Sequence, residues 1–470
     1  MGAGAAGLFT ALTAARAGAR VALVSATPLA RTASYWAQGG LAAALAADDS
    51  PELHLADTER AGRDLVRRSA AEVLCREAPD RVADLVEMGV RFDADREGRL
   101  ALGLEGGHSI RRIVHAGGSA TGRRLVRQLS ALAVEEPRIE VIEGSRAAAI
   151  WTGDGRCRGL VLEDGRALST RGVVLCTGGM AALWARTTNP PGSLGTGLLL
   201  AHRAGAALAD LELMQFHPTA VAGVRGREGF LISEAIRGEG ATLHNADGER
   251  FVDELAPRDE VARAVHAEMR RTGASSVGLD MRHIDPALFP NVIAALREAG
   301  VDPATELVPV APAAHYGMGG IVTDLDGQST VPGLFAVGEA ACTGLHGANR
   351  LASNSLSECF VFGARAAHAA LGEPAVRAGE PPATAPVPWP SEATREAMWR
   401  HAGLERTPEG LRALTRDEHP LARLVAACAL ARTESRGAHL RTDAPQTDRA
   451  LDHHHTVVRA SGEVTLEPWA

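Results

Sequence analysis

The sequence opens on glycines whose spacing suits the binding of a pyrophosphate. Gly2-Ala3-Gly4-Ala5-Ala6-Gly7 has the form G-x-G-x-x-G, and apolar residues at helical spacing follow it as far as Ala15. Such glycines permit a tight turn and let the backbone approach a phosphate at the N-terminus of a helix. On this motif alone, an ordinary glycine-rich helix start remains the alternative to a dinucleotide site.

Two further segments of small residues suit contact with a ligand. Residues 33–43 include Gln38-Gly39-Gly40, which is typical of backbone lying against a bound molecule. Arg350 stands in a stretch rich in Gly, Asn and Ser, where a guanidinium group can bind a carboxylate through two hydrogen bonds.

The basic and sulfur-containing residues exclude several kinds of chemistry. All 49 basic residues are arginines, so no lysine is available for a Schiff base or a phosphate-binding loop. The net charge of −8 argues against general nucleic-acid binding, which needs a basic surface. No C-x-x-C pair occurs, so we expect no metal site and interpret the cysteines as reduced structural thiols, at Cys75, Cys157, Cys176, Cys342, Cys359 and Cys428.

The length and hydrophobicity of the chain indicate a folded protein of several lobes. Its 470 residues are 46% hydrophobic, and no apolar run reaches the roughly 18 residues of a membrane-spanning helix. We also find no signal peptide and expect the protein in the cytoplasm, without membrane contact.

The elements that must position the first motif are a helix after it and a buried strand at Val21–Val24. The strand that normally precedes such a motif is missing, because only Met1 comes before it. We therefore expect the true start to lie upstream. Ser25 also stands near the place where an acidic residue usually binds the ribose.

Downstream, strands and helices alternate. The pattern predicts helices within residues 51–90 and 121–136, and an antiparallel insert within residues 139–176. Residues 213–323 form a separable block. Residues 373–390, rich in Pro, Ala and Glu, are typical of a linker. The last 80 or so residues should be helical up to about Arg436 and then irregular.

Taken together, the motifs resemble one family, L-aspartate oxidase, within the fumarate reductase and succinate dehydrogenase flavoprotein group. The resemblance spans nearly the whole chain. Besides the opening glycines, it rests on Tyr35-Trp-Ala-Gln-Gly-Gly40, Glu105-Gly-Gly-His108, Thr177-Gly-Gly179, Gln215-Phe-His-Pro-Thr219, Ser233-Glu-Ala-Ile-Arg-Gly238, Ala256-Pro-Arg-Asp259, His315-Tyr-Gly-Met-Gly-Gly320, Gly338-Glu339, the segment 345–355 and Glu434-Ser-Arg-Gly437.

The resemblance implies an α/β fold in which a capping domain of α+β type interrupts a doubly wound FAD-binding domain. Residues 1–212 and 324–372 would form the FAD-binding domain and residues 213–323 the cap. After the linker, residues 391–470 would form a short C-terminal helical domain and tail.

For the substrate, the resemblance implies a clamp for a dicarboxylate made by His217, Ser233, His315 and Arg350. Arg258 would donate or accept the substrate proton, although a pure carboxylate contact is the alternative for this residue. Glu105 would orient the α-ammonium group, which would favour an amino acid over a plain dicarboxylate.

For the cofactor, the resemblance implies contacts with FAD along the two small-residue segments and at two later sites. Ala33 stands where respiratory relatives carry a histidine linked covalently to FAD, so we expect non-covalent binding. Thr196 stands where the family has an acidic residue, which suggests weaker binding. The expected FAD-binding residues are Gly2, Ala3, Gly4, Ala5, Ala6, Ala33, Ser34, Tyr35, Trp36, Ala37, Gln38, Gly39, Gly40, Glu339, Ser355 and Leu356.

The activity implied is oxidation of L-aspartate to iminosuccinate, with oxygen or fumarate as electron acceptor. In the family this reaction feeds quinolinate synthesis for NAD, and quinolinate synthase would be a partner. The nearest alternative is a soluble fumarate reductase. A third is a degenerate flavin-binding protein that binds a partner without turnover.

Overall fold

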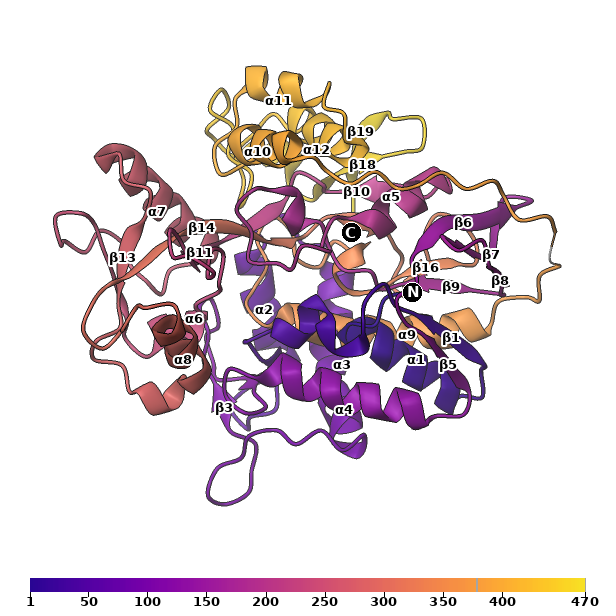
Figure 1. Cartoon of the computed structure of the whole chain (residues 1–470), viewed down its shortest axis with the longest axis horizontal. Coiled ribbons are helices and arrows are strands. Elements are labelled where there is room, and N and C mark those ends of the chain that lie inside the picture. The colour runs from indigo at the N-terminus through magenta and orange to yellow at the C-terminus, as the bar shows by residue number, and fades with distance from the viewer. Residues whose placement is uncertain (378, 470) are drawn as a thin grey trace.

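The structure of the chain is a computed structural model that describes residues 1–377 and 379–469. Figure 1 shows the first third of the chain and the orange helix after residue 350 forming the lower body of the molecule. Residues 214–317 lie beside this body on the left, and residues 392–468 lie across its top.

Four short parallel strands lie in the body. β1 (Val21–Val24) pairs with β5 (Ile139–Ile142), and β9 (Val173–Leu175) pairs with β16 (Leu334–Ala336). Apolar residues predominate in these runs, as expected for parallel strands covered on both faces.

Met1 and Gly2 join the two parallel pairs through main-chain hydrogen bonds. The amino group of Met1 donates to the carbonyl oxygen of Val174 (2.8 Å), and the N–H of Cys176 donates to the carbonyl oxygen of Met1 (2.7 Å). On the other side, the N–H of Gly2 donates to the carbonyl oxygen of Val24 (2.8 Å). These two residues therefore lie between β1 and β9.

Three long helices pack together beside these strands. α1 (Ala5–Arg16) contacts both α4 (Thr121–Glu135) and α9 (Asn354–Leu371). Phe9 and Phe360 meet edge to face, with ring centroids 5.1 Å apart, in the core between α1 and α9. The other α-helices of this part of the chain are α2 (Pro51–Ala61), α3 (Arg68–Glu87) and α5 (Thr196–Arg203).

Smaller elements complete the body. The predicted insert is confirmed as an antiparallel sheet of β6 (Ala147–Gly153), β7 (Arg156–Leu162) and β8 (Ala167–Ser169). A second antiparallel sheet contains β2 (Leu41–Ala42), β4 (Ile113–Val114) and β3 (Leu102–Gly103). In the body and in the other two parts of the chain, short 3-10 helices lie at Leu29–Arg31, Ala33–Trp36, Ala181–Leu183, Pro286–Leu288, Gly338–Ala340 and Arg449–Leu451.

The group on the left of Figure 1 has its own sheet and its own core. Its antiparallel strands follow the order β11 (Met214–Val221), β14 (Val308–Gly317), β13 (Val277–Asp280) and β12 (Thr242–His244). The register between β11 and β14 shifts after Gln215 and again after His217. The accompanying helices are α6 (Glu234–Gly238), α7 (Arg258–Thr272) and α8 (Pro290–Glu298).

The last part of the chain begins with three helices, as predicted, but does not then become irregular. After α10 (Glu392–His401), α11 (Pro408–Leu414) and α12 (Pro420–Ala431), the chain forms a hairpin of β18 (His454–Val458) and β19 (Val464–Pro468).

The hairpin extends a sheet from the body. β18 pairs with β10 (Leu208–Ala209), which pairs in turn with β15 (Gly320–Val322) and, through it, with β17 (Ala341–Cys342). This strand is hard to predict because its four buried residues are consecutive and do not alternate with exposed ones. His455 and Thr456 bind the carboxylates of Asp210 and Glu212, and Val457 and Val458 are buried as well.

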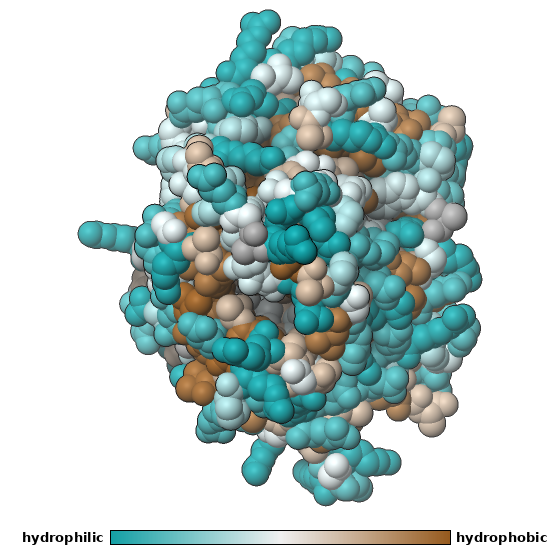
Figure 2. Space-filling view, turned by 90° about the vertical axis from the view of Figure 1, so that its right-hand side faces the viewer, coloured by the Kyte–Doolittle hydropathy of each residue, from teal (hydrophilic) through white to brown (hydrophobic). Residues whose placement is uncertain are grey.

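The described residues of the segment 373–390 contain no helix or strand. Figure 2 shows one face of the molecule as mostly hydrophilic, with hydrophobic residues interspersed among polar ones. Within residues 1–377 and 379–469, no helix combines the length and the apolar character needed to cross a membrane.

Candidate functional site

Two buried arginines donate hydrogen bonds to the same side-chain amide group. Arg258 begins α7, and Arg350 lies in the loop before α9. The Oε1 atom of Gln215 on β11 accepts a hydrogen bond from Arg258 Nη1 and another from Arg350 Nε, each 3.3 Å long. Its Nε2 atom donates to Asn349 Oδ1 and to the carbonyl oxygen of Arg350. Gln215 thereby holds two like charges together.

Arg350 is a cation without a carboxylate partner. Burial and the charge of Arg258 lower the pKa of Arg350 to about 10, so the group stays protonated at neutral pH. The ring of Tyr316 lies 4.6 Å from its guanidinium carbon, and Ser355 Oγ accepts a 2.5 Å hydrogen bond from its Nη1. No carboxylate in the described part of the chain forms an ion pair with Arg350, which leaves its charge available to an anion.

Arg258, in contrast, has a carboxylate partner that the sequence analysis missed. Glu234 Oε2 accepts a 2.6 Å hydrogen bond from Arg258 Nε, and Glu234 Oε1 lies 3.7 Å from Arg237 Nη2. Burial alone would raise the pKa of Glu234, but the charges of Arg258 and Arg237 lower it below its ordinary value. The only feature of the sequence that could have drawn attention to Glu234 is its place in the motif Ser233-Glu-Ala-Ile-Arg-Gly238.

The two predicted histidines lie next to each other on neighbouring strands. The rings of His217 on β11 and His315 on β14 lie 5.1 Å apart, edge to face. Burial, followed by neighbouring positive charge, holds the pKa of both rings well below the ordinary value, so both are neutral. The N–H of Thr219 donates to His217 Nδ1, which places the proton of that ring on Nε2. Thr188 Oγ1 fixes His315 through Nδ1 at 2.7 Å.

Ser233 lies beside this group, as the residue before α6. Its Oγ atom accepts a hydrogen bond from the N–H of Ala235 and so caps the helix that carries Glu234. The hydroxyl hydrogen is not used in that contact and can be donated to a ligand.

Glu105 is a buried, ionised carboxylate near the arginines. Ser353 Oγ donates to Glu105 Oε2 at 2.6 Å, and His115 Nε2 lies 3.6 Å from its Oε1. Burial alone would raise the pKa of Glu105, but the contacts with His115 and Ser353 and the charge of Arg258 lower it to about 2. Ser353, which the sequence analysis missed, has a positive φ of 62° and also accepts from the N–H of Gly40.

The opening glycines have no room for side chains. A Cβ atom on Gly2 would lie 2.1 Å from the carbonyl oxygen of Cys176, and one on Gly7 would lie 1.8 Å from the carbonyl oxygen of Gly2. The N–H of Ala5 donates to Ser34 Oγ at 3.1 Å, so the second small-residue segment lies directly against the start of α1. Glycine is thus required at Gly2 and Gly7 because the chain packs closely against itself at the start of this helix.

The segment of residues 33–40 connects this helix start with Glu105. Gln38 Nε2 donates to the carbonyl oxygen of Leu231, while Gln38 Oε1 is buried without a partner. A Cβ atom on Gly39 would lie 3.5 Å from Glu105 Oε1. An orphaned buried acceptor fits a ligand that offers an N–H group, as the isoalloxazine ring of FAD does.

The remaining residues of the predicted cofactor site range from exposed to buried. Arg123 and Arg127 lie over the ring of Tyr35, and Trp36 is 59% exposed. Ala33 begins the 3-10 helix of these aromatic residues, and the carbonyl oxygen of Ala37 accepts from the N–H of Gly122. Ala3, Ala6 and Leu356 are buried, Gly4 is the residue before α1, and Ser355 faces Arg350 rather than α1.

Glu339 completes the set as a partly buried carboxyl group whose pKa is raised. One oxygen accepts from the N–H of Gly317 at 3.0 Å. Burial raises the pKa of Glu339 to about 7. In its ionised form the carboxylate can accept hydrogen bonds from the hydroxyl groups of a ribose, so this residue also suits FAD.

This pKa predicts the pH dependence of the FAD-free protein. Between the ordinary value of 4.5 and about 7, the native state keeps a proton that the unfolded state has lost. The contribution to stability is therefore complete below pH 4.5 and is lost as the pH rises through 7. Urea unfolding midpoints of the FAD-free protein should show this slope, and Glu339→Gln should flatten it. An unchanged slope in the variant would contradict the shifted pKa.

Comparisons with known proteins show what the chain as a whole is similar to. A family model described as "FAD binding domain" matches residues 1–356, and one described as "Fumarate reductase flavoprotein C-term" matches residues 416–468. The L-aspartate oxidase of Caulobacter vibrioides is 46% identical over 95% of this chain and 93% of its own. That of Agrobacterium fabrum is 44% identical over 95% and 91%.

A solved structure gives the same answer for the fold. A variant of the E. coli quinol fumarate reductase superposes with a TM-score of 0.88 and 29% identity, covering 99% of this chain and 95% of the other. The predicted α/β fold and the predicted cofactor are thus confirmed. The chain belongs to the L-aspartate oxidase family of FAD-dependent oxidoreductases, within the fumarate reductase group of flavoproteins.

Proposed function

We propose that this chain oxidises L-aspartate to iminosuccinate in the site around Gln215. The observation that carries the proposal is the arrangement of charge: two adjacent guanidinium groups with an ionised carboxylate, Glu105, close by. Arg350 suits a carboxylate of the substrate, Arg258 lies next to it, and the carboxylate of Glu105 suits the ammonium group. The sequence identity to proteins named L-aspartate oxidase supports the same substrate.

FAD, when bound, supplies the acceptor for the hydride that leaves the α-carbon. The residues that would hold it are the backbone of residues 2–6 for the pyrophosphate and residues 33–40 for the ring. Glu339 would bind the ribose, with Ser355 and Leu356 near the ring. The binding of FAD would be non-covalent, because Ala33, at the position of the FAD-linked histidine, has no reactive side chain.

The chain's own residues would bind and orient the substrate. Arg350 would bind one carboxylate, helped by Ser233 and by the neutral rings of His217 and His315. A neutral imidazole donates a hydrogen bond without adding a third and fourth positive charge beside the arginines. Glu105 would hold the ammonium group, so that the α-carbon faces one direction only.

Arg258 would exchange the proton at the substrate. An isolated guanidinium is a poor base, because its pKa exceeds about 12. Here Nε donates to the ionised Glu234, which holds the guanidinium group in place, and the proton-exchanging role itself is proposed from the resemblance to the family. The alternative, a pure carboxylate contact, predicts a different response to the substitution of Arg258 by lysine.

The division of labour between domains is part of the same proposal. Residues 1–212 and 324–372 would bind FAD, residues 213–323 would close over the substrate, and residues 391–470 would pack against both, after the linker of residues 373–390. We further propose that the reaction takes place in the cytoplasm, that oxygen or fumarate accepts the electrons, and that quinolinate synthase receives the product.

The decisive test is an anaerobic spectrum of the FAD-loaded protein. L-aspartate should bleach the flavin absorbance, and succinate should not. Bleaching by succinate instead would point to a soluble fumarate reductase or succinate dehydrogenase type of flavoprotein. No bleaching by either would point to a flavin-binding protein without turnover. Reoxidation of the bleached protein by oxygen or by fumarate then identifies the acceptor.

The Glu105→Gln substitution tests the basis of substrate selection. Glutamine keeps the shape and an acceptor for Ser353 but loses the charge that faces the ammonium group. Removal of one charged hydrogen bond should lower kcat/KM for L-aspartate by about 10–100-fold. Fumarate reduction with a chemical reductant should change much less, since fumarate carries no ammonium group. Equal losses in the two assays would contradict the assignment.

A further inference from the structure

An ion pair joins the body to the first turn of α7, directly beside the residue proposed to exchange the proton. Arg63, in the loop after α2, donates from Nη2 to both oxygens of Asp259, at 3.0 and 3.1 Å, and to Glu260 Oε1 at 2.6 Å. Asp259 follows Arg258 in the chain and is 5% exposed. Arg63 has a positive φ of 59°, so its loop is held in an uncommon conformation.

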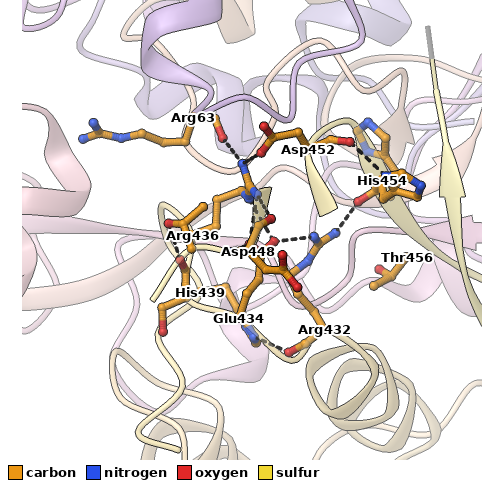
Figure 3. Close-up of polar contacts among 12 residues, drawn as sticks. Arg63, Arg432, Glu434, Arg436, His439, Asp448, Asp452, His454 and Thr456 are labelled. Atoms are coloured by element: carbon orange, nitrogen blue, oxygen red, sulfur yellow. Dashed lines mark hydrogen bonds and ion pairs between the residues drawn. The ribbon is translucent and has the colours of Figure 1, made fainter. Parts of the chain in front are cut away.

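The C-terminal part of the chain binds the backbone of the same loop (Figure 3). Arg436 Nη1 donates to the carbonyl oxygen of Arg63 at 2.8 Å. Arg436 is itself fixed by two parallel 2.9 Å hydrogen bonds to Glu434, and the carboxylate of Glu434 also binds Arg432. All three of these side chains are buried. The rigid buried network thus ends on the backbone of Arg63.

A second contact leads from the C-terminal part directly to α7. Arg263, one turn along the helix from Asp259, donates to the carbonyl oxygen of Gly437 at 3.1 Å and lies 3.4 Å from Asp259 Oδ2. Asp259 therefore lies between Arg63 and Arg263, both of which are attached to residues 436–437. The start of α7 is fixed at two points by one short segment.

We propose that Arg63 and Asp259 form a latch, anchored by Arg436, that holds α7 against the body and so positions Arg258. Arg63 is a positioning residue and not a catalytic one, since it contacts Asp259 and Glu260 rather than Gln215, Glu234 or Arg350. The inference rests on the proposed role of Arg258. A helix start displaced by about 1 Å would separate Arg258 from its target and can lower a rate by about 100-fold.

The experiment compares Arg63→Gln, Asp259→Asn and the double variant as FAD-loaded proteins. Each single change should lower kcat for L-aspartate by about 10-fold, with KM changed less than about 3-fold, because positioning acts on the reacting geometry. The double variant should lose no more than either single variant, since both break the same contact. Arg63→Lys should recover part of the loss. FAD content and melting temperature should stay near those of the unsubstituted protein.

The matched control is Arg270→Gln. Arg270 lies on the same helix and forms an exposed ion pair with Glu405 of the C-terminal part, but it is three turns away from Arg258. It should leave kcat unchanged. Unchanged kcat in Arg63→Gln and Asp259→Asn, or losses that simply multiply in the double variant, would overturn the latch. Failure of the proposed function would look different: the unsubstituted protein would not be bleached by L-aspartate, or an Arg258 variant would retain turnover.

Discussion

Replacing Arg258 by lysine should lower kcat for L-aspartate by about 100–1,000-fold, the range seen when one aligned donor is removed from a transition state. Arg258 uses separate nitrogens for Glu234 and Gln215, and its planar group leaves others for the substrate. Lysine has one ammonium group at the end of a flexible chain and cannot reach these partners together. Stopped-flow reduction of the flavin by L-aspartate measures the loss directly.

The result distinguishes the two roles left open for Arg258. If it only binds a carboxylate, lysine keeps the charge, and the main effect falls on KM. If it exchanges the proton, kcat falls and KM changes little. Arg270→Lys, on the exposed part of the same helix, should behave like the unsubstituted protein. Near-normal flavin reduction by Arg258→Lys would contradict the proton-exchange role.

Glu434→Gln should be the most destabilising single change in the C-terminal part. The carboxylate of Glu434 binds Arg432 at 3.0 Å and Arg436 at 2.9 Å, and all three groups are buried. Arg432 keeps Glu212 and Arg436 keeps Asp452 as a second carboxylate, so the cost should lie near the lower end of the roughly 3–5 kcal/mol that is typical of a broken buried ion pair. The amide of glutamine would also direct a donor at a guanidinium group. Urea unfolding followed by circular dichroism should show a much lower midpoint.

An exposed pair in the same part of the chain provides the control. Glu409 and Arg412 form an ion pair with exposed side chains, so Glu409→Gln should hardly change the midpoint. If Glu434→Gln were as stable as Glu409→Gln, the buried network would not contribute to folding as its geometry suggests. Replacing the whole network by apolar residues is a separate case, because it leaves no charge unpaired.

Local patterns in the sequence predicted much of the fold. The strand at Val21–Val24, the helix at residues 121–136 and the antiparallel insert each depend on neighbours in the sequence, and each is confirmed. The membership of the family and the FAD cofactor followed from motifs that keep their order along the whole chain. These features could be predicted because their signal is either short-range or shared with relatives.

What the sequence could not predict are contacts between distant residues of ordinary type. Gln215, Glu234 and Ser353 stand inside motifs, but nothing in their neighbourhood shows that they bind Arg258, Arg350 and Glu105. The pairing of Arg63 with Asp259 spans 196 positions. The strand β18 was not predicted because two of its four buried residues are polar and bind partners about 245 positions away.

The pairing of β10 with β18 also delays the completion of this sheet during synthesis of the chain. Leu208 cannot meet Val458 until 250 more residues have been synthesised. At about 5–20 residues per second, that delay is roughly 12–50 s. During it, the edge of β10 is open to other strands and must be shielded or slow to react. Maturation of this flavoprotein should therefore be sensitive to the rate of translation across the second half of its message.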